Sequence, residues 1–335
     1  MAKLDYLAIK NRRVDLDITQ QQLAEITDVG LSTIKAVETG RSLTEPENIQ
    51  KICDALKLDC GEVYFPHFKD TKVISVINNK GGCGKTSVCS SVGYALAEMG
   101  YKVLLIDSDS QRNLTASYNL GKTAMNFGAA VSKEESLQKY IVSTAFENID
   151  IVPADVSMGT LDMLLFTKMH RENIVRQILD RVIKIGIYDF IWIDTNPNLS
   201  LLNFNIINAS HYCLIPVQPA GFDVEGIVTV VDFIHGVQKF NDELDIIGIV
   251  INRYDARNKT ISEAAVSELK SAYGKLLFDT IIQVDVKIQN AQWENRPVFS
   301  LPSSRIAREY RALTKEIIAR CGVSMAGAST RRISG

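Results

Sequence analysis

The sequence lacks any long hydrophobic run, and its apolar stretches, such as 103–106 and 246–251, are only strand-sized. A membrane-spanning helix needs roughly 18 to 20 apolar residues, so none is predicted. The first residues lead into charge rather than into an apolar segment, so no secretory signal is visible. The six cysteines include no Cys-x-x-Cys pair and no zinc-ligand spacing, and the four histidines are scattered. We therefore expect a cytoplasmic protein with reduced thiols and no zinc site.

Charge of neither sign dominates, with 37 Lys and Arg against 39 Asp and Glu, but the charges are distributed unevenly. Residues 1–70 carry 9 basic and 12 acidic side chains, whereas residues 296–335 carry 8 basic and 2 acidic ones. The basic C-terminal end is a candidate anion-binding surface. The length of 335 residues, with 46% hydrophobic and 23% charged residues, predicts about two globular domains and excludes a fibrous or disordered chain.

Residues 1–68 are predicted to form a small all-helical domain. Thr19 and Thr44 are each followed three residues later by Gln or Glu and then by apolar residues at helical spacing, which is typical of a capping box. Ser32 is expected to cap a third helix. The turn Asp28-Val29-Gly30 lies between two of these helices. Helix, tight turn and helix make the helix-turn-helix arrangement, in which the second helix enters the major groove of DNA.

The segment 18–64 resembles the phage-repressor or XRE-type helix-turn-helix domain over nearly its whole length. The pieces TQQQLAE and STIKAVETG are the most specific parts. The resemblance implies that operator DNA is bound by outward-facing residues, which are Gln21, Ser32, Thr33, Lys35 and Arg41. The alternative is a helical bundle used for dimerisation, because an excess of acidic residues is unusual in a DNA-binding domain. Local positive charge suffices if Arg12, Arg13, Lys35 and Arg41 gather on one face.

Residues 72–321 change to strand-like apolar runs, separated mostly by helical patterns at spacings that suit parallel crossover connections. These runs are 73–77, 103–106, 149–152, 190–193, 213–217, 246–251 and 277–282. Continuous apolar strands indicate a sheet that is covered on both faces. The predicted fold class is therefore α/β, a mostly parallel sheet covered by helices, preceded by the small all-α domain. The small and polar tail, 322–335, is expected to be disordered.

A glycine-rich loop, residues 78–87 with the sequence NNKGGCGKTS, directly follows the first of these strands and precedes a helical run. Such a loop can wrap its backbone N–H groups around phosphate oxygens, and a helix that begins near Lys85 presents its positive dipole end to the same anion. Asn79 stands where the standard pattern G-x-x-x-x-G-K-[ST] has its first glycine, and Lys80 adds a second lysine. This arrangement is the deviant Walker A motif.

The region 72–321 resembles the ParA/MinD/Soj family of P-loop ATPases. Beyond the loop, the match rests on VLLIDSDSQRNLT at 103–115, YDFIWID at 188–194 and LIPVQP at 214–219. The resemblance implies a P-loop NTPase that binds ATP and Mg²⁺. Its nucleotide-binding residues would be Lys80, Gly81, Gly82, Cys83, Gly84, Lys85, Thr86, Ser87, Pro216 and Asn252.

Three residues depart from the family pattern, since Ser110 and Arg112 replace its Pro and Gly, and Asn196 replaces the first Pro after the second motif. Cys83 within the loop is either a reactive thiol or simply a small residue that the loop tolerates. By resemblance, Lys80 would reach the nucleotide of a second copy in an ATP-bound homodimer. It would act there like an arginine finger.

The resemblance also assigns catalytic and metal-binding roles. Lys85 would neutralise charge on the β- and γ-phosphates, and the Thr86 hydroxyl would ligate Mg²⁺. Asp194 would hold the metal through a water molecule, with Asp107 orienting the metal shell or the attacking water. Asp109, two residues past the end of a predicted strand, would position that water. For Asp107 and Asp109 the alternative is a purely structural role in capping strand ends.

Membrane-cycling relatives carry an amphipathic C-terminal anchor. Residues 321–332 have no such face, so no membrane partner is expected. The basic segment 303–318 and the loop after residue 254 are similar instead to parts of the partition ATPases. The residues expected to bind DNA without sequence preference are Arg257, Arg305, Arg308 and Arg311. For each arginine the alternative is a solvated helix face.

These motifs and resemblances together predict a DNA-partition ATPase, a nucleoid-associated protein of the cytoplasm. Its ATP-bound dimer would coat DNA and be released by hydrolysis that a ParB-like centromere-binding adaptor stimulates. The N-terminal domain would bind an operator, plausibly that of the protein's own operon. The alternative is a nucleotide-switched transcriptional regulator that moves no cargo.

Overall fold

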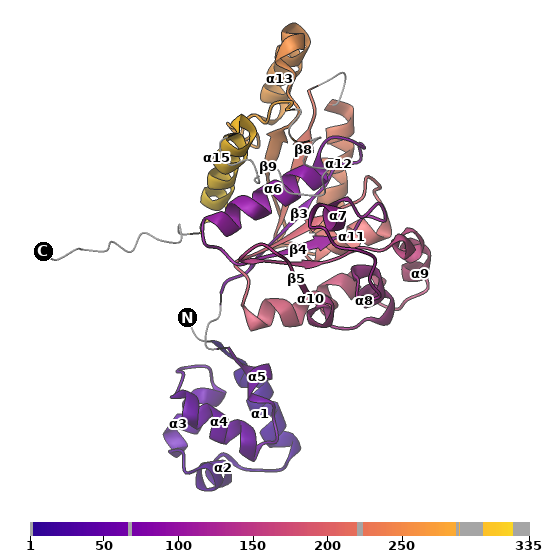
Figure 1. Ribbon diagram of the computed structural model, residues 1–335. Helices are drawn as coiled ribbons and strands as arrows, with labels where there is room; N and C mark the ends of the chain where they lie inside the picture. The colour runs from indigo at the N-terminus through magenta and orange to yellow at the C-terminus, as the bar shows by residue number, and fades with distance from the viewer. Residues whose placement is uncertain (1–2, 66–68, 220–223, 286–287, 289–303, 324–335) are drawn as a thin grey trace, which may run out of the picture. The chain divides into compact units, whose positions relative to one another are not determined.

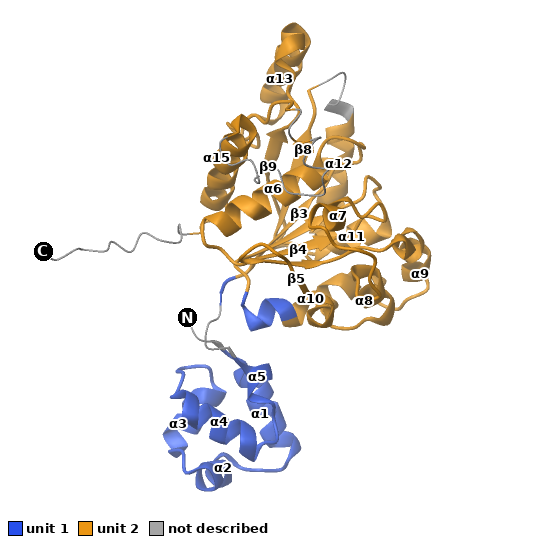
Figure 2. Ribbon diagram, viewed as in Figure 1, with its two compact units in different colours: residues 1–70, 182–187 blue, residues 71–181, 188–335 orange. Residues whose placement is uncertain are grey.

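The computed structural model describes residues 3–65, 69–219, 224–285, 288 and 304–323. These residues fall into two compact units (Figure 2), one made of 1–70 with 182–187 and the other of 71–181 with 188–335. The segment 324–335, which contains most of the tail expected to be disordered and to lack an anchor, lies outside the described residues. No helix in the described part of the chain is long and apolar enough to cross a membrane.

The N-terminal unit is helical, as predicted. Its elements (Figure 1) are β1 (Lys3–Leu4), α1 (Tyr6–Asp15), α2 (Gln20–Thr27), α3 (Leu31–Glu38), α4 (Pro46–Ala55), α5 (Cys60–Val63) and β2 (Tyr64–Phe65). β1 pairs antiparallel with β2 and so joins the two ends of the unit. The helices enclose a core of fully buried aliphatic residues, which includes Ile9, Leu23, Ile34, Ile49, Ile52 and Leu56.

The start of α2 confirms the first predicted capping box. The Thr19 hydroxyl accepts a hydrogen bond from the Gln22 backbone N–H at 3.1 Å, and the Gln22 side chain accepts one from the Thr19 N–H at 2.8 Å. Two otherwise unpaired backbone donors at this helix end are thereby satisfied, which fixes where α2 begins.

The predictions that Thr44 and Ser32 cap helices are wrong. α4 begins at Pro46, with Glu45 in the cap position and no side-chain cap. Proline suits the first helical position because its fixed φ is already helical and its missing N–H would be unpaired there anyway. α3 begins one residue after Gly30, whose carbonyl oxygen accepts from the first turn, so Ser32 is exposed within the helix.

The second unit contains a seven-stranded sheet with the strand order β5-β6-β4-β7-β3-β8-β9. The strands are β3 (Lys72–Val76), β4 (Val103–Asp107), β5 (Val142–Ser143), β6 (Ile149–Val152), β7 (Phe190–Asp194), β8 (Tyr212–Val217) and β9 (Asp245–Ile251). Every neighbouring pair is parallel except β5 with β6. The predicted mostly parallel α/β sheet is confirmed.

Helices cover both faces of this sheet, as its continuous apolar strands require. The helices are α6 (Lys85–Glu98), α7 (Asn113–Ser117), α8 (Phe127–Lys133), α9 (Leu161–Phe166), α10 (Ile174–Ile185), α11 (Leu201–Asn208), α12 (Val224–Gln238), α13 (Lys259–Tyr273) and α15 (Arg305–Arg320). α6 and α15 lie together in one core cluster (Figure 1), and α12 packs into a second cluster. α6 follows β3 through the glycine-rich loop, which places that loop at the carboxyl end of a central strand.

The strand predicted at 277–282 is wrong. Within this segment only Leu277 forms an isolated bridge, with Ile249, and Gln283 just beyond it bridges Tyr254. Between them, the Glu316 carboxylate of α15 accepts hydrogen bonds from the backbone N–H groups of Asp279 (2.8 Å) and Thr280 (2.9 Å). A side chain thus satisfies donors that a continuous ladder would have used.

Candidate nucleotide-binding site

The glycine-rich loop is built around backbone conformations that only glycine adopts easily. Gly82 and Gly84 have φ values of +77° and +94°. A Cβ atom on Gly84 would lie 2.0 Å from the Asn252 amide nitrogen, so no larger residue fits there. Lys85 is the first residue of α6, whose N-terminal N–H groups form the positive end of the helix dipole. The loop therefore has both the curvature and the polarity of a phosphate site.

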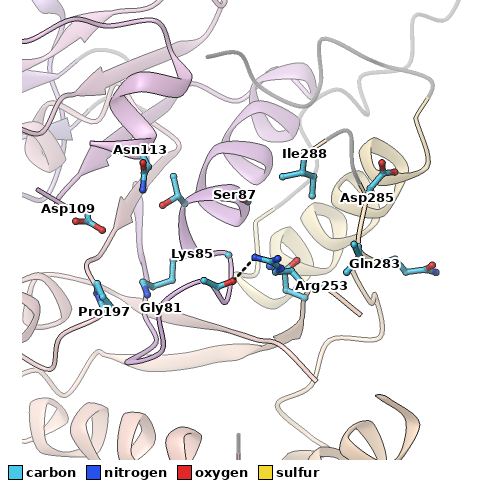
Figure 3. Close-up of a pocket in the computed structure, with 15 residues that line it drawn as sticks. Gly81, Lys85, Ser87, Asp109, Asn113, Pro197, Arg253, Gln283, Asp285 and Ile288 are labelled. Carbon is cyan, nitrogen blue, oxygen red and sulfur yellow. Dashed lines mark hydrogen bonds between the residues drawn. The ribbon is translucent and has the colours of Figure 1, made fainter. Parts of the chain in front are cut away.

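Four loop carbonyls are held by side chains. The Lys85 ammonium donates to the carbonyls of Asn78 (3.0 Å) and Lys80 (3.1 Å). Asn252 donates to the Cys83 carbonyl at 2.7 Å, and Arg253 donates to the Gly82 carbonyl at 3.0 Å (Figure 3). With these oxygens engaged, the negative ends of the loop's peptide dipoles are neutralised.

A cavity of about 330 Å³ opens beside the loop. Its lining residues are Gly81, Gly82, Gly84, Lys85, Thr86, Ser87, Asp109, Asn113, Pro197, Asn252, Arg253, Gln283, Val284, Asp285 and Ile288. Figure 3 shows Asp109 and Pro197 at one end of the cavity, and Gln283, Asp285 and Ile288 at the other. Most of the residues predicted from the motif are therefore brought together around one cavity.

The wall formed by Gln283, Val284 and Asp285 was not predicted, because no motif in the sequence marks it. The Val284 N–H donates to the Tyr254 carbonyl at 2.9 Å, which fixes this segment beside the end of β9. Pro216 differs from its prediction, since it is buried within β8 and does not line the cavity. Its carbonyl accepts a hydrogen bond from Asn78 at 2.8 Å, so Pro216 supports the loop from behind.

Two carboxylates lie side by side at the ends of β4 and β7, where Asp107 pairs in register with Asp194. Asp194 is fully buried, and neither of its carboxylate oxygens has a hydrogen-bond partner among the described residues. Burial raises the pKa of Asp194 well above its ordinary value, the charge of Asp107 raises it further, and Thr86 and Lys85 lower it. A buried carboxylate without a partner calls for an explanation, and a bound cation supplies one.

The donors around Asp194 fit Mg²⁺. This ion prefers oxygen ligands and is usually held by one or two carboxylates together with substrate phosphates. The Thr86 hydroxyl could supply one such oxygen, and the Asp194 carboxylate could hold the ion through a water molecule. No cluster of three or more Asp, Glu, His or Cys occurs in the described part of the chain, so a cage made entirely of protein ligands is absent there.

Asp107 is held differently from Asp194. One of its carboxylate oxygens accepts from the Thr115 N–H (2.8 Å) and hydroxyl (2.6 Å), and the other accepts from the Asp109 N–H (3.1 Å). Burial raises the pKa of Asp107 and these hydrogen bonds oppose the rise, so that the pKa lies at about 6. Because both oxygens are engaged by the protein, Asp107 fits the role of positioning the Asp109 loop better than direct metal ligation.

We expect Asp194→Asn to raise the melting temperature of the protein without nucleotide and magnesium, because an amide cannot ionise, whereas burial and the neighbouring Asp107 oppose ionisation of the Asp194 carboxyl. Each kcal/mol gained corresponds to about 2 to 4 °C for a unit of this size. Asp107→Asn is the matched comparison and should lower the melting temperature, because the lost acceptor leaves buried donors unpaired at about 1 to 3 kcal/mol. Scanning calorimetry in EDTA measures both. A fall for Asp194→Asn would contradict the metal-site interpretation.

The remaining predicted residues of the loop region lie in three different settings. Asp109 lines the cavity and accepts from the Gln111 N–H at 3.0 Å. The Lys80 side chain is exposed and is not among the residues lining the cavity. Cys83 is 1% exposed, and burial raises the pKa of its thiol although Lys85 lowers it. This favours a small packing residue at position 83 over a reactive thiolate.

Arg112, which replaces a glycine of the family pattern, retains the left-handed backbone with φ +59°. Its guanidinium donates to the carbonyls of Ala154 (3.1 Å) and Gly121 (2.8 Å). These contacts compensate for the strain that a non-glycine residue has in this conformation. The substitution therefore fastens the segment after Asp109 to its surroundings.

Two of the arginines predicted to bind DNA on α15 have partners within the protein. Arg311 forms a two-bond pair with Glu98 of α6, at 2.6 and 2.8 Å. Arg305 donates to Gln283 and to the Val284 carbonyl, at 2.9 and 3.0 Å.

Arg308 and Arg257 remain exposed candidates for DNA contacts. Arg308 is exposed and has no salt bridge within 4 Å to the described residues. Arg257 has a side chain that is 81% exposed, and it pairs with Asp255 at 2.8 Å. Such a surface pair contributes little to stability and can be exchanged for a phosphate contact.

In the N-terminal unit, the predicted contact residues are exposed or half-buried, namely Gln21, Ser32, Thr33, Lys35 and Arg41. Arg12 and Arg13, which would add positive charge if they gathered on one face with Lys35 and Arg41, instead have partners within the domain. Arg13 forms a two-bond pair with the buried Glu38, at 2.5 and 3.0 Å, and Arg12 donates to the Leu56 carbonyl at 3.2 Å. Both arginines hold the domain together, which leaves Lys35 and Arg41 as its basic candidates for DNA contacts.

Comparisons with known proteins agree with this architecture. A family model described as "AAA domain" matches residues 71–246, and one described as "Helix-turn-helix" matches residues 9–63. The chain is 31% identical over 253 residues to the sporulation initiation inhibitor protein Soj of Bacillus subtilis, covering 74% of this chain and 98% of Soj. It is 29% identical over 254 residues to the chromosome partitioning protein ParA of Caulobacter vibrioides, and the match covers 74% of this chain and 94% of ParA.

A solved structure, cobyrinic acid a,c-diamide synthase from Mycobacterium smegmatis with a bound ATP analogue and magnesium, is also similar. It has a TM-score of 0.65 and 26% identity, and the match covers 76% of this chain and 98% of the synthase. A protein of this fold thus binds an adenine nucleotide and magnesium.

Proposed function

Because this chain belongs to the ParA/Soj family of P-loop ATPases and carries an N-terminal helix-turn-helix domain, we propose that it is a DNA-partition ATPase. Its ATP-bound homodimer coats DNA without sequence preference, and hydrolysis releases it. The observation that carries the ATPase assignment is the buried carboxylate of Asp194, without a partner among the described residues, next to a phosphate loop of the family's type.

Each part of the site has a role in this proposal. Lys85 moves from the loop carbonyls to the β- and γ-phosphates, while Asn252 and Arg253 keep the loop in shape. Thr86 and Asp194 hold Mg²⁺, which when bound neutralises charge on the phosphates. Asp109 orients the attacking water, and Asp107 positions the loop on which Asp109 stands.

In the proposed homodimer, the second copy of the chain supplies Lys80 to the nucleotide site. Lys80 lies next to the phosphate loop, but its exposed side chain is not among those lining the cavity of its own subunit. This placement suits a Lys80 side chain that reaches across a dimer interface. Its ammonium would stabilise charge on the phosphoryl group transferred in the partner subunit. A ParB-like adaptor stimulates this step, and nucleoid association follows from the DNA coat.

The two DNA-binding modes are expected to be separable by point variants. Lys35→Ala should weaken operator binding by about 1 to 3 kcal/mol if its ammonium contacts a base, and leave random DNA unaffected. Arg308→Glu should weaken binding to all sequences alike, because phosphate contacts carry no sequence information. Fluorescence anisotropy on operator and random duplexes, with ATP or ADP across a salt series, measures both. Point variants are preferable to removal of residues 1–68, because residues 182–187 belong to the same compact unit.

The hydrolysis assay tests the whole assignment. Slow ATP hydrolysis by the full-length protein, stimulated by DNA together with the adaptor, is expected. Operator binding that requires ATP, without stimulated hydrolysis and without ATP-dependent binding to random DNA, would instead establish the nucleotide-switched regulator.

A further inference from the structure

α15 holds the unpredicted wall of the nucleotide cavity with a row of side chains. Glu316 accepts from the N–H groups of Asp279 and Thr280, and about two turns closer to the start of α15, Glu309 accepts from the Gln283 N–H at 2.9 Å. Arg305, at the start of the helix, binds the same segment. The wall makes only a few backbone hydrogen bonds, to Ile251 at the end of β9 and to Tyr254, so the contacts from α15 add a second anchor on its other side.

Arg305 makes the most extensive of these contacts. Its guanidinium donates to the Gln283 side chain (2.9 Å) and the Val284 carbonyl (3.0 Å), and it lies 3.9 Å from the Asp285 carboxylate. Its Nε atom is 3.5 Å from Glu309, one turn along the helix. Gln283, Val284 and Asp285 all line the cavity. One side chain on the basic helix is thus joined to three adjacent residues of the cavity wall.

A neighbouring face of α15 packs against α6, the helix that begins at the phosphate loop. Tyr310, Leu313 and Ile317 share a core cluster with residues of α6, and Arg311 pairs with Glu98 near its end. α15 is therefore connected both to the phosphate end of the cavity, through α6, and to the far wall, through Arg305.

We infer that Arg305 is a positioning residue that couples the nucleotide cavity to the DNA-binding surface of α15, and that it is not itself a DNA contact. The inference rests on the proposed function. A nucleotide that fills the cavity presses on Gln283, Val284 and Asp285, and the guanidinium transmits any shift of this wall to the helix as a whole. Arg308 and Lys315, exposed on the same helix and without a salt bridge to the described residues, then carry the contacts to phosphate.

Coupling of this kind is reciprocal. If ATP raises the affinity for DNA by some factor, DNA must raise the affinity for ATP by the same factor, typically about 5- to 150-fold. Loss of Arg305 should therefore reduce, by the same factor, the effect of ATP on DNA affinity and the effect of DNA on ATP affinity. A direct DNA contact would behave differently, because its loss weakens DNA binding in every nucleotide state and leaves ATP affinity in the absence of DNA unchanged.

The test compares full-length Arg305→Ala, Arg305→Lys and Arg308→Ala with the unmodified protein. Affinity for a non-hydrolysable ATP analogue is measured by calorimetry, and affinity for a random duplex by anisotropy with the analogue or with ADP. For Arg305→Ala we expect about tenfold weaker analogue binding, the equivalent of about 1.4 kcal/mol, and a coupling factor near unity. Arg308→Ala should weaken DNA binding in both nucleotide states alike and keep the coupling factor.

Arg305→Lys separates geometry from charge. Lysine keeps the positive charge but cannot reproduce the forked contacts of a guanidinium, so we expect it to resemble alanine in analogue binding and coupling. If lysine restores DNA binding and Arg305→Ala leaves analogue affinity unchanged, Arg305 is a DNA contact and the inference is wrong. If the unmodified protein shows no nucleotide-dependent DNA binding, the proposed function fails, independently of Arg305. Melting curves confirm that each variant is folded.

Discussion

Lys80→Ala is expected to bind ATP and yet lose hydrolysis by about 10³ to 10⁵, the contribution of an arginine finger in other NTPases. The physical reason is its position. The Lys80 backbone is fixed to the loop, since its N–H donates to the Asn78 side chain at 2.9 Å and its carbonyl accepts from Lys85. Its exposed side chain is not among the residues lining the subunit's own cavity. Removing it should leave the cavity intact and deprive the partner subunit of a cation.

Asp109→Ala is the matched comparison for Lys80→Ala. It should also bind ATP without hydrolysing it, but it should accumulate as the closed dimer, because the group that orients water is lost and the intersubunit contact is kept. Light scattering with ATP distinguishes the two variants, and phosphate release measures turnover. Mixing Lys80→Ala with Asp109→Ala should restore part of the activity, because a mixed dimer contains one intact site. Normal turnover of Lys80→Ala as a monomer would exclude a role across the interface.

Lys85→Ala is expected to weaken ATP binding by about 10² to 10⁴. The Lys85 ammonium already donates two hydrogen bonds, to the carbonyls of Asn78 and Lys80, and it is 7% exposed. Two bonds between charged groups contribute about 3 to 6 kcal/mol, which corresponds to this loss of affinity. The effect should exceed that of any other single change in the loop, because the same ammonium also orders the loop before nucleotide binds.

Calorimetric titration with ATP and Mg²⁺ measures this effect, and Lys85→Met keeps most of the side chain's volume as a control for packing. Both variants should bind ATP about 10² to 10⁴ times more weakly, and alanine should lower the melting temperature more than methionine does, because methionine keeps most of the buried volume. ATP binding by Lys85→Met with near-normal affinity would show that packing rather than charge governs the site.

The sequence by itself determined the elements whose signals are local. The loop 78–87, the capping box at Thr19 and the seven-run pattern of the sheet depend on neighbouring residues, and all but the last run are present as predicted. Asp107 and Asp194 directly follow the predicted runs 103–106 and 190–193, and the parallel pairing of β4 with β7 brings them together. The caps at Thr44 and Ser32 failed because Pro46 and Gly30 compete within the same few residues.

Only the tertiary structure decided which of several similar side chains are available for function. Nothing local distinguishes Arg305 and Arg311 from Arg308, or Arg13 from Lys35, yet the partners Gln283, Glu98 and Glu38 lie 22, 213 and 25 residues away. The same holds for Asp194, which has no partner among the described residues, and Asp107, which is fully hydrogen-bonded, although both end buried strands. A charged group is satisfied by whatever the fold brings within about 3 Å of it, and sequence spacing does not determine that distance.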